Sequence, residues 1–216
     1  DINLDEDLVR TARWVIAQGR NILPVCSAGL AHAFARFLKP PVRSTQPAPV
    51  EQIRTDGRLL IVIGSTLPEI SSQVQVLLPT RPDVAVIEAA NGNRIDIDIG
   101  SLTEPIIVLR IIQGTKTVSR EEASKNLAET TRLILGMLPV SQLVAVGGDT
   151  SNAVLNSLGI SGFDIAAQDI QGLPRGETVY DNSPLTFVAK PAGFSNTSIF
   201  ADVAEEFQPR TKGSDL

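Results

Sequence analysis

The chain has 216 residues, of which 43% are hydrophobic and 20% are charged, and its formal net charge is −5. This composition supports a packed core and excludes a mainly disordered protein, while the acidic balance argues against nonspecific nucleic-acid binding, which needs a basic surface. A single cysteine, Cys26, excludes an internal disulfide framework, and a single histidine, His32, excludes a metal site built from several histidines.

No apolar run approaches the roughly 20 residues needed to span a bilayer, and the acidic start is unlike the basic opening of a signal peptide. We therefore expect a soluble, cytoplasmic protein that does not interact with membranes. The only methionine is Met137, so the chain does not begin at an initiator methionine. We expect it to be part of a longer protein.

Hydrophobic periodicity and turn residues predict helices and strands that alternate along the chain. The first part is predicted to contain a helix at 5–18, a buried strand at 22–25, a helix to about residue 38 and a proline-rich loop at 40–49. The middle is predicted to contain strands at 59–63, 84–89, 94–99 and 105–112, and helices at 69–78 and 120–138. The last part is predicted to contain strands at 143–146, 163–170 and 185–190, and helices at about 151–158 and 198–207.

This alternation predicts an α/β fold with a mainly parallel sheet flanked by helices. The Asn91–Gly92 turn, followed by the alternating pattern of residues 94–99, predicts a hairpin and hence a mixed sheet. The proline-rich loop is too short and too early to divide two stable domains. We therefore expect one domain over residues 1–207 and a frayed tail at 208–216.

Three strand-to-helix junctions, which end at Ser65, Gly148 and Gly193, are candidate ligand sites. Open α/β sheets bind ligands at the carboxyl ends of their strands, where a helix N-terminus offers free N–H groups to an anion. The strongest candidate is Gly147–Thr150, because two glycines let the backbone approach a phosphate closely. Asp149 is the acid at this junction that could hold a magnesium ion or accept a proton.

These features also have structural interpretations. Gly-Gly-Asp-Thr is a good turn and N-cap, and a glycine with a hydroxyl, as at Ser65, often serves only the turn. Lys190 could meet a phosphate as a point charge, although a lysine at a strand end is more often solvated. Neither a Walker A pattern nor the ordinary Rossmann fingerprint occurs. Other polar residues are expected to be structural: a buried, inert Cys26, a structural His32, and a solvated strand face at Asp96 and Asp98.

Taken in order, the junctions resemble the C-terminal, nucleotide-binding domain of the four-carbon acid sugar kinases from about residue 5 to residue 207. Four segments carry the resemblance. They are residues 23–31 (LPVCSAGLA), which are similar to the family's Gly-Ser-Ala-Gly-Leu-Ala; Gly64–Ser65 with Pro68 and Gln73, similar to Gly-Ser-x-Ser-Pro; Gly147–Ser151, similar to Gly-Gly-Glu-Thr-Ser-Gly; and Lys190 with Gly193–Phe194, similar to Lys-Ser-Gly-Gly-Phe-Gly.

The resemblance implies that Ser65, Gly147–Thr150 and Gly193, together with Lys190, contact ATP bound with Mg²⁺. It implies transfer of the terminal phosphoryl group to a hydroxyl of a four-carbon sugar acid, such as a threonate or erythronate derivative. In the family, a substrate domain with an Asp-Asp-Leu-Thr-Gly motif near its start precedes this one. This chain has no such motif, so we expect it to need that N-terminal domain as a partner and to be inactive alone.

Two further hypotheses remain open. The chain departs from the family pattern at several positions, and glycines are replaced at Asn152, Ala192 and Ser195. The second hypothesis is therefore a degenerate domain that acts as a non-catalytic binding or regulatory module. The third is a complete small enzyme of the ribokinase type, to which Gly147–Asp149 is similar only in outline. The other departures are Cys26 in place of glycine, Leu67 in place of serine, Asp149 in place of glutamate, and Pro191 in place of serine.

Overall fold

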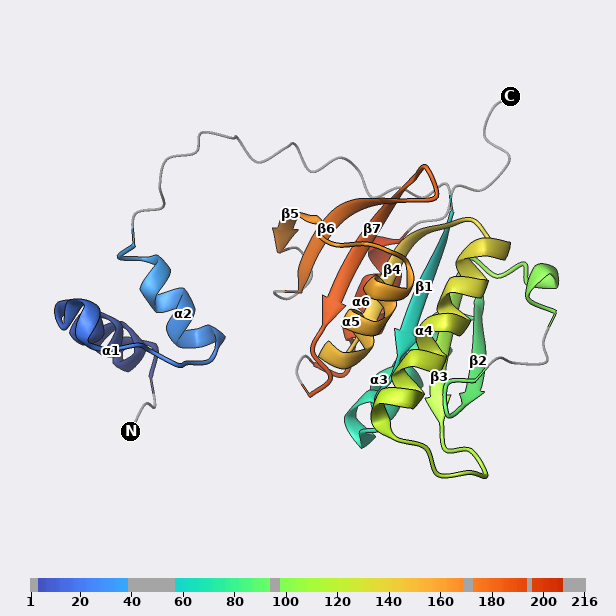
Figure 1. The fold of residues 1–216 in the computed structure, drawn as a ribbon, viewed down its shortest axis with the longest axis horizontal. Coiled ribbons are helices and arrows are strands. Elements are labelled where there is room, and N and C mark those ends of the chain that lie inside the picture. Colours follow the sequence, from blue (N-terminus) through green and yellow to red (C-terminus); the bar gives the residue numbers. More distant parts are fainter. Residues whose placement is uncertain (1–3, 39–56, 94–97, 169–172, 194–195, 208–216) are drawn as a thin grey trace. The chain divides into compact units, whose positions relative to one another are not determined.

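The computed structural model describes residues 4–38, 57–93, 98–168, 173–193 and 196–207. The chain forms two compact units, residues 1–46 and residues 47–216 (Figure 1). The boundary falls in the predicted proline-rich loop, and residues 40–49 lie outside the described ranges. The sequence predicted one domain over residues 1–207, and that domain assignment stays a prediction.

Over its described residues 4–38, the first unit contains two helices, α1 (Asp5–Ala17) and α2 (Ala28–Ala35), with a short 3₁₀ helix at Gly19–Asn21. Both helices were predicted. Ala12 and Val15 of α1 and Ala33 of α2 are buried, so the small apolar core of this unit lies on these faces.

The predicted strand at 22–25 is wrong. These residues have no regular structure, and Leu23 and Val25 are 88% and 95% exposed. A strand needs a neighbouring strand to satisfy its backbone groups, and the described part of the first unit contains none. Cys26 is likewise exposed rather than buried, and His32 is exposed on α2.

The residues of the second unit that the structure describes form a seven-stranded sheet in the order β2-β3-β1-β4-β7-β6-β5. The strands from β2 to β7 in this order pair in parallel, and β7, β6 and β5 pair antiparallel. The predicted α/β fold with a mainly parallel, mixed sheet is confirmed. The bounds of the elements are β1 Arg58–Ile63, α3 Pro68–Thr80, β2 Val84–Ala90, a 3₁₀ helix Ile99–Ser101, β3 Ile106–Ile112, α4 Arg120–Met137, β4 Val140–Val146, α5 Gly148–Ser157, β5 Asp164–Gln168, β6 Pro174–Tyr180, β7 Ser183–Lys190 and α6 Ile199–Glu206.

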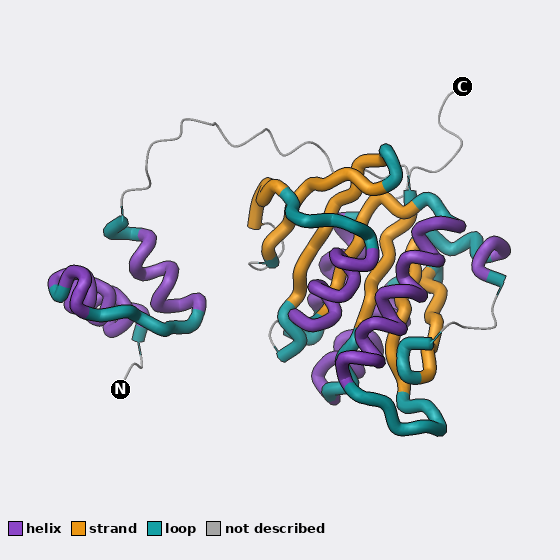
Figure 2. The backbone as a smooth tube through the Cα atoms, viewed as in Figure 1, coloured by secondary structure: helices purple, strands orange, loops and turns teal. Residues whose placement is uncertain are grey.

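Helices cover both faces of this sheet (Figure 2). Alternate residues of a strand point to opposite faces, so Leu59 and Ile61 of β1 pack with α3 and α6, whereas Leu60 and Val62 pack with α4 and α5. This two-sided burial explains why the central strands are continuous apolar runs.

The antiparallel pairs of the sheet are β5-β6 and β6-β7, not the hairpin predicted at Asn91–Gly92. Asn91–Gly92 is a turn, but β2 pairs in parallel with β3 and forms no hairpin there. Of the predicted strand at 94–99, residues 94–97 lie outside the described ranges, Asp98 is exposed and Ile99 begins a 3₁₀ helix. Asp96, the other acid of that face, is among the residues outside the description.

Strand β6 was not predicted. Its sequence, PRGETVY, contains a proline and a glycine, which are uncommon within strands. It forms because β5 and β7 satisfy its backbone groups on both sides. Among the residues that the structure describes, no helix is both long and apolar enough to cross a bilayer.

Candidate functional site

Strands β1 and β4 lie side by side and parallel at the centre of the sheet, and the connections that follow them cross opposite faces. After β1 the chain enters α3 on one face, and after β4 it enters α5 on the other. Two neighbouring strands whose following helices lie on opposite faces leave a crevice at their carboxyl ends. The sheet order therefore places the main candidate site at Ile63 and Val146, the last residues of these strands.

A pocket of about 430 Å³ lies in this crevice. We call it the strand-end pocket. Five of the sequence-predicted site residues line it: Ser65, Gly147, Gly148, Asp149 and Thr150. The other residues that line it are Gly64, Thr66, Leu67, Ile111, Arg120, Ala123, Ser124, Val146 and Ala192.

Gly147 forms the sharp turn from β4 into α5. Its φ is +99°, a backbone conformation that residues with a side chain rarely adopt. Its N–H donates to the carbonyl of Lys190 at 2.8 Å, which joins the ends of β4 and β7. No side chain caps the N-terminus of α5. The first-turn N–H groups, beginning at Gly148, therefore lack intrahelical acceptors and offer the positive end of the helix dipole to the pocket.

Thr150 packs directly against Gly64. The Thr150 side chain is 3% exposed, and a Cβ built on Gly64 would lie 1.9 Å from its Oγ1. The absence of a side chain at Gly64 thus lets the end of β1 approach the first turn of α5. The neighbouring Ser151 hydroxyl donates within the helix, to the carbonyl of Gly147 at 2.9 Å, so it is already satisfied.

The chain after β1 forms the opposite wall of the strand-end pocket. The Ser65 Oγ accepts a hydrogen bond from the N–H of Leu67 at 3.3 Å, which shapes the entry into α3. Leu67 is the N-cap residue and provides no side-chain cap, and Pro68 occupies the first helical position, where its missing N–H costs nothing.

Lys190 does not line the pocket and is not solvated. Its side chain is 1% exposed on the face that α6 covers, where its Nζ donates to the Pro191 carbonyl at 3.0 Å and lies 5.5 Å from the centre of the Phe200 ring. Burial lowers the pKa of Lys190 to about 8. The sequence favoured a solvated lysine at this strand end. That prediction is wrong, because alternation along β7 turns residue 190 toward α6. Gly193 is exposed, and its neighbour Ala192 lines the pocket instead.

The lowered pKa of Lys190 predicts a pH-dependent stability. The unfolded chain keeps the pKa near 10.5, so between pH 8 and 10.5 it binds more protons than the folded chain, and stability rises with pH. The free energy of unfolding of Lys190→Met is therefore expected to exceed that of the natural chain most at pH 7. This difference should shrink as the pH rises from about 8 toward 10.5. Thermal unfolding midpoints across this range check it, with the exposed Lys125→Met as a control. A difference independent of pH would refute this explanation.

Three pocket residues from α4, namely Arg120, Ala123 and Ser124, were not predicted as site residues. They reach the pocket because β3, which precedes α4, pairs with β1. Arg120 is the first helical residue and contributes a cation to the rim of the pocket. Nothing in the sequence signals that role, because the neighbour of β1 is known only from the sheet order. Within the described ranges, no group of three or more His, Cys, Asp or Glu residues could hold a metal ion.

Comparison with known proteins agrees with this geometry. Residues 103–200 match the family described as a nucleotide-binding C-terminal domain. The chain is also 27% identical to a 3-oxo-tetronate kinase from Burkholderia multivorans over 164 residues, which cover 68% of this chain and 38% of that protein.

Solved structures of similar fold include the following two. A domain of unknown function from Bordetella bronchiseptica, solved as a domain-swapped dimer with bound citrate, has a TM-score of 0.59 at 24% identity and covers 96% of this chain and 50% of that chain. A Salmonella typhimurium LT2 protein named as a candidate tRNA synthase has a TM-score of 0.62 at 18% identity, with 96% and 52% covered. At these identities the likeness shows the fold alone.

The chain spans about half the length of these two solved structures and 38% of the length of the curated relative. The matched domain covers α4, the turn after β4 and Ala192, which line the strand-end pocket. The family match and the kinase relative support the resemblance of this chain to the nucleotide-binding C-terminal domain of the four-carbon acid sugar kinases.

Proposed function

We propose that the strand-end pocket binds the phosphate groups of ATP, and that the chain supplies the nucleotide half of a cytoplasmic kinase for a four-carbon sugar acid. The observation that carries this proposal is the uncapped N-terminus of α5 at the switch point between β1 and β4. Free N–H groups, a helix dipole and glycine-lined walls are a general means of binding phosphate. The kinase relative supports ATP as the nucleotide.

The residues of the pocket suit phosphoryl transfer, which depends on positioning and charge neutralisation. The N–H groups from Gly148 to Thr150 face the phosphates, and the hydroxyls of Ser65 and Thr66 donate from the opposite wall. Arg120 adds a positive charge at the rim. Asp149, which is exposed in the first turn of α5, would hold Mg²⁺, whose role when bound is to neutralise phosphate charge.

The sugar acid requires a partner. Because the chain spans 38% of the curated relative, we propose that the hydroxyl to be phosphorylated is presented by a separate N-terminal substrate domain. The first unit of this chain, which has Leu23 and Val25 almost fully exposed, is a candidate contact for that domain. The chain alone is expected to bind nucleotide without phosphorylating a sugar acid.

A second candidate function is a non-catalytic binding or regulatory module. The observation that favours it is the position of two departures from the family pattern: Ala192 lines the strand-end pocket, and Asn152 lies on the next turn of α5. The double variant Asn152→Gly, Ala192→Gly separates the two functions. If the module hypothesis holds, the natural chain does not bind nucleotide and the double variant does. If the kinase hypothesis holds, the natural chain already binds ATP without these substitutions.

Calorimetric titration of Mg·ATP into the natural chain tests the proposed function. We expect saturable binding with a dissociation constant in the micromolar to low millimolar range, which corresponds to about −8 to −4 kcal/mol. AMP, which lacks the two terminal phosphates, is the matched control and should bind more weakly. Absence of binding at millimolar Mg·ATP contradicts the proposal.

A further inference from the structure

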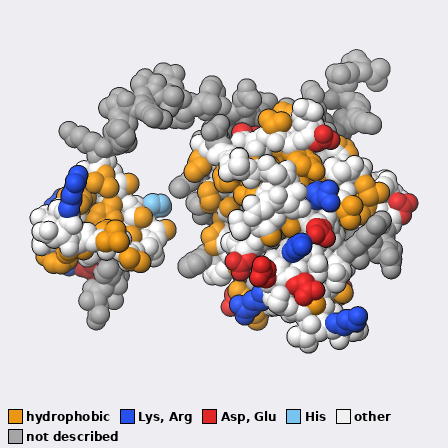
Figure 3. Space-filling view, viewed as in Figure 1, with side chains coloured by type: hydrophobic (Ala, Val, Ile, Leu, Met, Phe, Trp, Pro, Cys, Tyr) orange, Lys and Arg blue, Asp and Glu red, His pale blue; other side chains and the backbone are white. Residues whose placement is uncertain are grey.

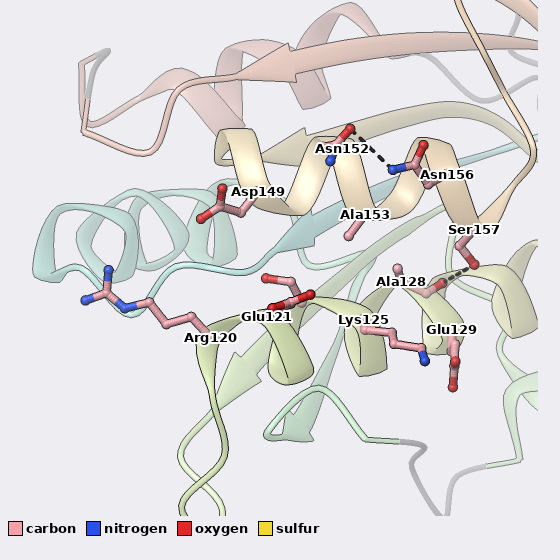
Figure 4. A pocket seen from close by; sticks show the side chains of 11 residues that line it. Arg120, Glu121, Lys125, Ala128, Glu129, Asp149, Asn152, Ala153, Asn156 and Ser157 are labelled. Carbon is pink, nitrogen blue, oxygen red and sulfur yellow. Dashed lines mark hydrogen bonds between the residues drawn. The ribbon is translucent and has the colours of Figure 1, made fainter.

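A second cavity of about 670 Å³ lies in a groove between α4 and α5. The two helices lie side by side on the same face of the sheet, and Figure 4 shows the side chains that both contribute. We call this cavity the helix groove. The residues that line it are Arg120, Glu121, Ser124, Lys125, Ala128, Glu129, Asp149, Asn152, Ala153, Asn156 and Ser157.

The helix groove continues the strand-end pocket. Arg120, Ser124 and Asp149 line both cavities. A ligand whose charged end occupies the strand-end pocket can therefore extend along the first three turns of α5 without leaving a lined surface. Cavities of a few hundred cubic ångströms are of the size that holds small cofactors.

The two cavities differ in chemistry. The strand-end pocket is rich in backbone N–H groups and glycines, whereas the helix groove has Ala128 and Ala153 between the helices and the amides of Asn152 and Asn156 along α5 (Figure 4). Side chains of both charge signs are interspersed on this face (Figure 3). The groove itself is lined by two cations and three acids, so its charges largely cancel. A flat, uncharged group with hydrogen-bonding edges suits this groove better than a further phosphate does.

Asparagine amides suit such a group because each offers a donor and an acceptor side by side, the arrangement that pairs with the edge of adenine. The Asn156 Nδ2 donates weakly to the Asn152 Oδ1 at 3.4 Å, which aligns the two amides along the wall. Both residues are exposed to solvent, so their polar atoms are accessible to a ligand.

We propose that the helix groove holds the base and ribose of the nucleotide whose phosphates occupy the strand-end pocket, and that Asn152 and Asn156 determine the specificity for the base. This inference rests on the proposed function. It assigns a role to Asn152, the residue at which the chain departs from the glycine of the family pattern: its amide contacts the base in this chain.

The test compares two probes, Mg·ATP and Mg·tripolyphosphate, on the natural chain and on the double variant Asn152→Ala, Asn156→Ala. Both substitutions are on an exposed face of α5, where alanine favours the helix. We expect the natural chain to bind ATP about tenfold or more tightly than tripolyphosphate, since only ATP carries a base. The double variant should lose about tenfold in ATP affinity, from two hydrogen bonds, and bind tripolyphosphate unchanged.

The exposed Arg132→Ala on α4, outside the groove, is the matched control and should bind both probes like the natural chain. Equal affinity for the two probes, with no effect of the double variant, would overturn the groove assignment and leave the proposed function standing. Failure of both probes to bind would overturn the two together. Equal losses of both probes in the double variant would show that the amides act on the phosphates, which also refutes the assignment.

Discussion

Gly148→Glu is expected to weaken Mg·ATP binding about tenfold or more without destabilising the fold. A Cβ on Gly148 meets nothing within 4 Å and the residue is exposed, so a side chain can begin there without a clash at its Cβ. A carboxylate in the first turn of a helix also interacts favourably with the helix dipole. The same carboxylate lies beside the phosphates and repels them, at a cost of about 1–4 kcal/mol for charges some 4 Å apart near a protein surface. The variant should therefore keep the stability of the natural chain while its affinity for Mg·ATP falls.

Two variants isolate the charge. Gly148→Gln has the shape of the glutamate without its charge and should retain most of the affinity. Gly162→Glu adds the same charge at another glycine whose Cβ meets nothing within 4 Å, outside the pocket. Calorimetric titration and thermal unfolding of all three check the prediction. If Gly148→Glu binds Mg·ATP like the natural chain, the phosphates do not lie at the start of α5.

Gly64→Ala is expected to lower the free energy of unfolding by about 1–3 kcal/mol, the usual cost of forcing a methyl group into a packed site. The added Cβ would lie 1.9 Å from the Thr150 Oγ1 and 3.1 Å from its Cβ, and Thr150 is buried. The end of β1 and the first turn of α5 must then separate, which widens the pocket. Mg·ATP affinity should fall together with stability.

A double-mutant cycle assigns this cost to the contact between the two residues. Thr150→Ala removes the Oγ1, so the double variant Gly64→Ala, Thr150→Ala should lose less stability than the sum of the single variants. Gly136→Ala is the control, because its Cβ meets nothing within 4 Å inside α4 and alanine favours a helix by about 1 kcal/mol. Strictly additive losses in urea unfolding would show that the contact is not the cause.

The fold class was predictable because strong apolar runs specify the central strands. Leu59–Ile63 and the long helix at 120–138 show clear patterns, and both are confirmed as β1 and α4. The strand order was not predictable, since no local pattern says that β3 and β4 flank β1. The antiparallel edge was missed for the same reason, because β6 is stabilised by its neighbours rather than by its composition.

The candidate site was predictable where the backbone determines it. Two glycines before a helix mark the turn at Gly147, which has a positive φ. Since the carboxyl ends of parallel strands meet at one edge of the sheet, that turn is expected to lie beside Ser65. The direction in which a side chain points was harder to predict from the sequence. Lys190 follows its strand as predicted, yet alternation along β7 turns it under Phe200 and away from the pocket. Arg120 entered the site through tertiary packing alone.

The most direct test of the strand-end pocket as a nucleotide site is a titration of Mg·ATP into the ¹⁵N-labelled chain, followed by amide NMR. We predict that the largest shift changes occur at Gly64, Ser65 and Gly147–Thr150, with smaller changes along the groove side of α5. The amides of α1 and α2 should stay unchanged and serve as the internal reference. Unchanged amides at the start of α5 at millimolar Mg·ATP, or changes confined to the first unit, would contradict the assignment of this pocket to phosphate binding.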